Sequence, residues 1–151
     1  MALVLSGSLA LGTPAATLSL EYPRIGYQNR CRDANCTITT STADTNAEGE
    51  SVINGLTYDF WLPTADPGVI AFTFTEAITA DYCGVAAHTL TETGNSVELQ
   101  YWDGLSPGSW VSLGSVLPGN SNGNPTIMFL FDETTSAIWR LITTGGSTVA
   151  A

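Results

Sequence analysis

The sequence contains no lysine and a single histidine, and only 12% of its 151 residues are charged. Four arginines stand against 14 acidic residues, so the formal net charge is -10 at pH 7. A chain this acidic repels phosphate backbones, and nucleic acid is therefore not an expected partner. Hydrophobic residues make up 44% of the chain, which is typical of one folded domain with its own core.

The sequence also lacks the patterns that carry common catalytic and metal-binding chemistry. It has no nucleophile elbow, no glycine-rich phosphate loop, and no second cysteine or histidine spaced to make a zinc site with Cys83. A glycosidase needs two carboxylates at a fixed separation, and nothing in the sequence singles out such a pair. We therefore expect a protein that is not an enzyme and that binds no metal and no cofactor.

The three cysteines form an odd set, so at least one of them has no intramolecular disulfide partner. Cys83 lies on the apolar face of a predicted strand and is interpreted as a small core residue. Cys31 and Cys36 flank a short polar loop, and the sequence leaves open whether they form a disulfide.

Residues 1–22 are predicted to form an N-terminal arm, followed by a β-sandwich domain over residues 23–151. The arm lacks the positive charge of a secretory signal, and its apolar run is too short and interrupted for insertion into a membrane. Its leucines have no evident place in a sandwich, so we expect them to pack on a neighbouring subunit, in a homo-oligomer. These assembly residues are Leu3, Leu5, Leu9 and Leu11.

Short runs with strand-like alternation fill the remainder of the chain. Residues 69–75 place Ile70, Phe72 and Phe74 on one face, and a second run covers residues 80–88. We expect these two runs to form a central hairpin. Further strands are predicted over residues 36–42, 96–102, 110–113, 126–131 and 137–142. Short strands without a long helix predict an all-β fold, an antiparallel β-sandwich or jelly roll.

Aromatic side chains are the best candidates for a binding surface, because flat rings stack on sugars and anchor interfaces. The candidates are Tyr58, Trp61, Tyr101, Trp102 and Trp110. Trp61 and Trp139 are interpreted as residues that fill the core. Trp102 faces away from the apolar residues of its strand and adjoins the Asp103-Gly104 turn signal, so we expect it to be the most exposed.

His88 lies where a predicted strand meets a loop. A lone histidine at such a position is more often a hydrogen-bonded structural residue than a functional one. The functional alternative is that its ring nitrogen contributes to a binding site, and that alternative stays open at this point.

Residues 50–143 resemble the galactose-binding-like domain, also called the discoidin or F5/8 type C-like domain. Four segments carry the resemblance, and in order they are NGLTYDFW at 54–61, ADYCGVAAHTL at 80–90, VELQYWDG at 97–104 before Trp110, and IWRLI at 138–142. With YPRIGY at 22–27 ahead of them, the layout most resembles a subgroup found in tailed-phage virion proteins. Family members commonly carry Asp near a cation site where this chain has Asn54, which agrees with the expectation of no metal.

The resemblance implies a galactose-binding-domain-like sandwich whose loops at one end carry the ligand site. The family usually closes with a further strand, for which only the small and polar residues 144–151 remain here, so the N-terminal arm or a neighbouring subunit is expected to complete the sandwich. The nearest candidates for binding a glycan or a partner there are Tyr58, His88 and Trp102. Our first hypothesis is a non-catalytic structural or adhesion subunit of a tailed-bacteriophage virion, in the tail, in the baseplate or as a capsid decoration. Its partners would be other virion proteins. The alternative is a carbohydrate-binding module that recognises a glycan on the host cell surface.

Overall fold

The computed structural model describes residues 10–11, 29–43, 48–53, 60–90, 94–116 and 126–145. Its elements are β1 (Ala10–Leu11), the 3-10 helix η1 (Arg30–Arg32), β2 (Cys36–Thr40), the 3-10 helix η2 (Gly49–Ile53), β3 (Gly68–Val85), β4 (Ser96–Trp102), β5 (Trp110–Val116) and β6 (Ile127–Thr144). No helix in these ranges has the length and hydropathy to cross a membrane. The prediction of an all-β antiparallel sandwich is confirmed.

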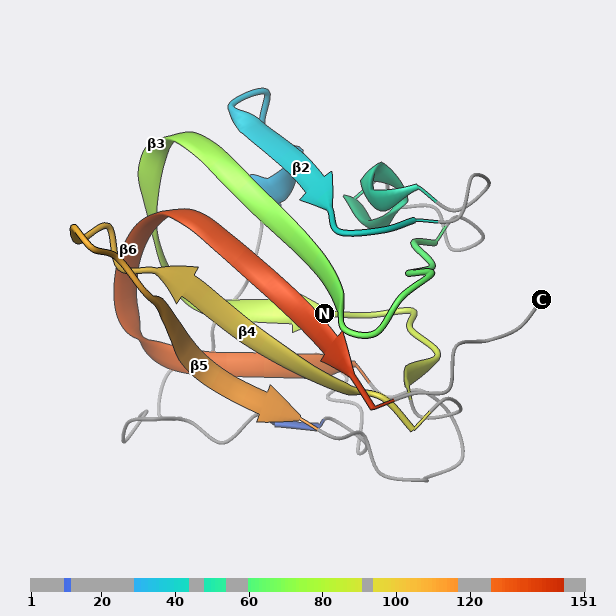
Figure 1. The fold of residues 1–151 in the computed structure, drawn as a ribbon. Helices are drawn as coiled ribbons and strands as arrows, with labels where there is room; N and C mark the ends of the chain where they lie inside the picture. Colours follow the sequence, from blue (N-terminus) through green and yellow to red (C-terminus); the bar gives the residue numbers. More distant parts are fainter. Residues whose placement is uncertain are drawn as a thin grey trace, which may run out of the picture.

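Two long strands, β3 and β6, organise the fold, and each has 18 residues. They run antiparallel to each other and bend together, so that each contributes to both layers of the sandwich (Figure 1). The register shifts between Thr73 and Ile78 and again between Ala80 and Tyr82. Extra residues of this kind bend a strand without ending it.

The predicted central hairpin over residues 69–88 is therefore wrong. Residues 75–77 are exposed, as a turn would be, yet they lie inside β3 and mark its bend. The two strands predicted over residues 126–131 and 137–142 are likewise two halves of β6. A polar break looks the same in a sequence whether the chain reverses there or only bends.

The first layer has the strand order β2-β3-β6-β4-β5, using the first half of β3 and the second half of β6. The other halves of β3 and β6 form the second layer, and β1 runs parallel to β6 at its edge. Ala10 lies opposite Ile127 there and Leu11 opposite Met128, so these two residues of the predicted arm pair with a strand of their own chain. The assembly role of the arm stays a prediction. Leu3, Leu5 and Leu9 lie outside the described residues.

The core lies between the two layers and is built mainly from one face of each strand. Its buried members are Ile70, Phe72, Phe74, Val97, Leu99, Leu113, Val116, Ile127, Phe129, Phe131 and Trp139. Trp139 is only 6% exposed, which confirms its predicted core position. Trp61 is partly buried against the same core and donates from Nε1 to the carbonyl oxygen of Thr42 at 3.0 Å. Each large apolar side chain buried in this way contributes about 1.5–3 kcal/mol.

Candidate functional site

The register of β4, β5 and β6 gathers four side chains on the outer face of the first layer. Trp102 lies opposite Trp110, and Gln100 lies opposite Arg140. Directly opposed residues point to the same side of a sheet, and so do residues two apart along a strand. Leu99 lies one step out of phase and is buried in the core. The four side chains Gln100, Trp102, Trp110 and Arg140 therefore face away from the core, and we call them the outer-face cluster.

Arg140 is the centre of the outer-face cluster. Its guanidinium carbon lies 3.8 Å from the centre of the Trp110 ring, which is a close cation–π contact. Its Nε and Nη2 atoms both donate to Oε1 of Gln100, at 2.8 and 2.6 Å. Burial lowers the pKa of Arg140 and the nearby Glu98 carboxylate opposes this shift. The group still stays protonated at neutral pH, because an arginine titrates far above that range.

The two tryptophans meet edge to face, with ring centres 5.4 Å apart and ring planes at 70°. Such pairs are favoured by the quadrupoles of the rings. The Trp102 ring also lies against Gly108, where an added Cβ atom would collide with Cζ2. Contrary to the expectation of an exposed ring, Trp102 is half-buried, because the loop that follows it packs on it.

That loop, which joins β4 to β5, is organised by the carboxylate of Asp103. Oδ1 accepts from the backbone N–H groups of Leu105 and Ser109, both at 3.0 Å, and Oδ2 accepts from the Ser109 hydroxyl at 2.7 Å. These hydrogen bonds, with the Ser109 hydroxyl first, lower the pKa of Asp103. Gly104 has a φ of +70°, which suits the predicted Asp-Gly turn. The loop thus holds Leu105 out into solvent, 69% exposed, beside the outer-face cluster.

The structure does not bring His88 and Trp102 into one site. His88 follows the end of β3, where Val85 lies opposite Ile127, the first residue of β6. The carbonyl oxygen of Trp102 instead accepts from the Ser136 hydroxyl, nine residues further along β6. Nine extended residues span roughly 30 Å, so the two side chains lie at opposite ends of the sandwich.

Tyr58 and His88 are the two other residues predicted for the ligand site. Tyr58 lies outside the described residues. Nδ1 of His88 accepts from the backbone N–H of Leu90 at 3.3 Å, which agrees with the structural interpretation of this histidine. Of the aromatic candidates named from the sequence, Trp102 and Trp110 take part in the outer-face cluster. Gln100 and Arg140 were not predicted as site residues from the sequence. The one feature that pointed to them was their position in the alternating pattern of the predicted strands.

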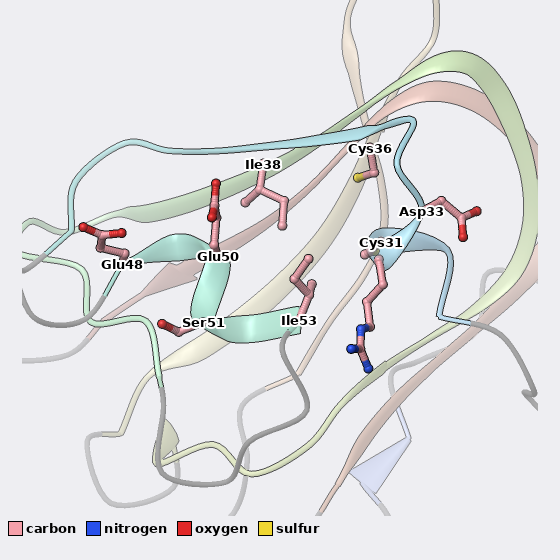
Figure 2. Close-up of a pocket in the computed structure, with 9 residues that line it drawn as sticks. Cys31, Asp33, Cys36, Ile38, Glu48, Glu50, Ser51 and Ile53 are labelled. Atoms are coloured by element: carbon pink, nitrogen blue, oxygen red, sulfur yellow. The ribbon is translucent and has the colours of Figure 1, made fainter.

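A concave region lies elsewhere, between η1, the start of β2 and η2, and has a volume of about 580 Å³. Figure 2 shows Cys36 and Ile38 pointing from β2 toward η2, and Glu50 and Ile53 pointing back from η2. The lining combines apolar side chains with the acidic side chains of Asp33, Glu48 and Glu50 and with Arg32. Within the described ranges, no three His, Cys, Asp or Glu side chains gather closely enough to hold a metal ion.

Cys31 and Cys36 both line this pocket and are free thiols in the structure. Burial is the largest cause that raises the pKa of Cys31 to about 12, and the neighbouring thiols Cys83 and Cys36 and the Asp33 carboxylate add to it. Burial also raises the pKa of Cys83 to about 11. Thiols with such values are protonated at neutral pH and react slowly.

No model of a known protein family matches this chain, and no curated protein matches it. Solved structures do. The family 32 carbohydrate-binding module of C. perfringens NanJ, in complex with galactose, matches with a TM-score of 0.57 at 13% identity, over 74% of this chain and 84% of that one. Chitosan-binding module 2 of a Paenibacillus sp. IK-5 chitosanase/glucanase, in complex with chitotriose, matches with a TM-score of 0.57 at 17% identity, over 76% of this chain and 87% of that one.

A larger protein contains the same fold. A GH29 fucosidase from Ruminococcus gnavus, in complex with fucose, matches with a TM-score of 0.64 at 15% identity, over 80% of this chain but only 24% of the fucosidase. At these identities the likeness establishes the fold alone. The described residues form a β-sandwich with the galactose-binding-like fold.

Proposed function

We propose that this protein is a non-catalytic glycan-binding module and that the outer-face cluster is its binding surface. The observation that carries the proposal is the pair of tryptophans held edge to face on the outer sheet face, with Arg140 stacked on one of them. The flat faces of such rings meet the apolar side of a sugar ring. Arginine and glutamine donors beside them can fix the orientation of the sugar through its oxygen atoms.

The structural neighbours support this proposal, because two of them are carbohydrate-binding modules in complex with a sugar. They support it at the level of the fold, since one fold can place binding sites on different surfaces. The choice of the outer-face cluster as the binding surface therefore depends on the chemistry of its own residues.

The virion hypothesis, which the sequence analysis put first, stays a prediction. The neighbours named above are two sugar-binding modules and a fucosidase, and they favour the glycan-binding alternative as the leading function. Location in a virion, other virion proteins as partners, and a homo-oligomeric state likewise stay predictions. A glycan-binding subunit of a virion would satisfy both hypotheses.

A glycan array that presents neutral and charged oligosaccharides to the full chain tests the proposal. We expect selective binding that Trp102→Ala or Trp110→Ala weakens at least about tenfold, which corresponds to about 1.4 kcal/mol. Phe60→Ala is the matched control, because Phe60 is an aromatic residue with 57% exposure outside the cluster, and this variant should bind normally. A folded protein that binds no glycan, or whose binding survives Trp102→Ala, would contradict the proposal.

A further inference from the structure

We infer that the outer-face cluster selects a sugar that carries a carboxylate, that is, a uronic acid. This inference rests on the proposed function and narrows the ligand class of the same site. It follows from which hydrogen-bonding groups of Arg140 and Gln100 are already used and which are left for a ligand.

The groups left over are all donors. A guanidinium has five N–H bonds, and Arg140 uses two of them, one on Nε and one on Nη2, toward Oε1 of Gln100. This leaves the two N–H bonds of Nη1 and one of Nη2. Oε1 is the only acceptor atom of the Gln100 side chain, and it is occupied, so Gln100 offers only the two N–H bonds of its amide. The pair therefore presents donors and no free acceptor group.

The shape of the free donors matches a carboxylate. The Nε–Nη2 edge of the guanidinium faces Gln100, and the remaining Nη1–Nη2 edge can hold a carboxylate through two parallel hydrogen bonds. A hydroxyl group both donates and accepts, so a neutral sugar uses this pair of parallel donors less fully than a carboxylate does. Trp102 and Trp110 beside this edge supply the apolar contact for the sugar ring.

Arg140 is also held in place before any ligand arrives. Its guanidinium is fixed by two hydrogen bonds to Gln100 and by its stacking on Trp110. The entropy cost of ordering a long side chain is therefore already met in the free protein, which favours binding. Arg30 and Arg32, the other arginines in the described ranges, lie on η1, and Arg30 there pairs with Asp33 at 3.3 Å.

The net charge of -10 and the nearby Glu98 oppose an anionic ligand. Charges further away than about 8 Å are largely screened at physiological salt, so contact with Arg140 dominates inside the cluster. Glu98 weakens the attraction of Arg140 for a carboxylate, and it offers no hydrogen-bond donor to one. We therefore expect short acidic oligosaccharides to bind better than long polyuronates, whose repulsion by the acidic protein adds up along the chain.

Calorimetric titration of the full chain with trisaccharides of galacturonate, glucuronate and mannuronate tests the inference. Each acid is compared with its methyl ester, which has the same sugar ring and no charge, and a sulfated neutral trisaccharide is included. We expect at least one acid to bind at least about tenfold more tightly than its own ester and than the sulfated sugar. Trp102→Ala should weaken acid and ester alike.

Two variants and one control assign the effect to Arg140. Arg140→Gln should abolish the difference in affinity between each acid and its ester. Gln100→Glu keeps a partner for Arg140 and replaces the free amide donors by an anion, so it should abolish the difference even if Arg140→Gln fails to fold. Arg32→Gln removes one positive charge on η1, away from the cluster, and should leave the difference intact.

The outcomes separate this inference from the proposed function. Equal binding of every acid and its ester, with both lost in Trp102→Ala, would overturn the inference and leave the glycan-binding function standing. A preference for acids that survives Gln100→Glu, or a sulfated sugar that binds as tightly as the best acid, would also overturn it. A folded protein that binds no acid, no ester and no glycan on the array would overturn both.

Discussion

The indole Nε1 of Trp139 donates a hydrogen bond to the carbonyl oxygen of Ser136 at 2.9 Å, across the bend where β6 passes between the layers. The Ser136 hydroxyl is buried and donates at 2.8 Å to the carbonyl oxygen of Trp102. The end of β4, which carries the outer-face cluster, is thus tied to the bend of β6. The Trp139 ring fills the core on the inner side, between Tyr101 and Phe131, at centre-to-centre distances of 5.9 and 6.0 Å.

We predict that Trp139→Ala lowers the free energy of unfolding by about 3–5 kcal/mol, because it removes a large buried ring and leaves a cavity. Trp139→Phe keeps most of the ring but leaves the Ser136 carbonyl without this donor, and should cost less. Denaturant unfolding of both variants measures these differences. A shift of a degree or two in the melting temperature of Trp139→Ala would show that the ring does not belong to the core.

A second prediction concerns the contact between Gly108 and Trp102. A Cβ atom at residue 108 would collide with the Trp102 ring, so Gly108→Ala must displace the ring or the loop. We expect a loss of stability of about 1–3 kcal/mol, as for an overpacked contact, together with weaker glycan binding. Gly84→Ala is the matched control, because no atom lies within 4 Å of a Cβ added at that strand position. If both variants behave alike, the Trp102 ring does not depend on this contact.

Much of the fold could be predicted from the sequence, because alternation reports directly which side chains face the core. Ile70, Phe72 and Phe74 were assigned correctly from their phase, and so was the inward direction of Leu99. The bend in β3 could not be predicted, because its exposed residues 75–77 look like a turn and only the pairing with β6 shows one continuous strand.

Less of the candidate site could be predicted. The outward direction of Trp102 followed from alternation, but the placement of Arg140 on the same face depends on β6 lying beside β4. These strands are not consecutive in the chain, and no local pattern reports that they are neighbours. The predicted grouping of His88 with Trp102 failed for the same reason, since both adjoin loops but at opposite ends of β6.

A third prediction concerns the N-terminal arm. Deleting residues 2–9 removes Leu3, Leu5 and Leu9 but keeps β1, so we expect a fully folded protein that no longer forms the predicted homo-oligomer. Deleting residues 2–17 also removes β1 and its pairing with β6, and should lower the melting temperature in addition. Size-exclusion chromatography with light scattering and a thermal melt measure the two effects. A full-length chain that is a stable monomer would rule out an assembly role for these leucines.

A fourth prediction follows from the buried thiols. Because the pKa values of Cys31 and Cys83 are raised to about 12 and about 11, both groups should react slowly with a thiol reagent at pH 8 in the folded state. Unfolding in denaturant should expose both thiols, which should then react fast. A raised pKa in the folded state means that the contribution to stability is complete below the unfolded value of 9.0 and is lost as the pH rises toward 11 and 12. Rapid labelling of the native protein at either position would contradict the burial.

The last prediction concerns the Asp103 carboxylate, which orders the loop beside the outer-face cluster. Its pKa is lowered by three hydrogen bonds from Ser109 and Leu105, so these bonds favour the charged form. A lowered pKa means that the stabilising effect is present above the ordinary value of 3.8 and is lost as the pH falls through the lowered value.

Asp103→Asn tests this by removing the charge while keeping the size of the side chain. At pH 7 we expect faster amide hydrogen exchange of Leu105 and Ser109 in the variant than in the wild type, together with weaker glycan binding. As the pH is lowered below 3.8, exchange in the wild type, corrected for its intrinsic pH dependence, should approach that of the variant. Trp102 packs on Gly108 inside the same loop, so disorder of this loop also loosens the ring that the proposed site needs. Equal exchange in both proteins at pH 7 would show that the carboxylate does not organise the loop.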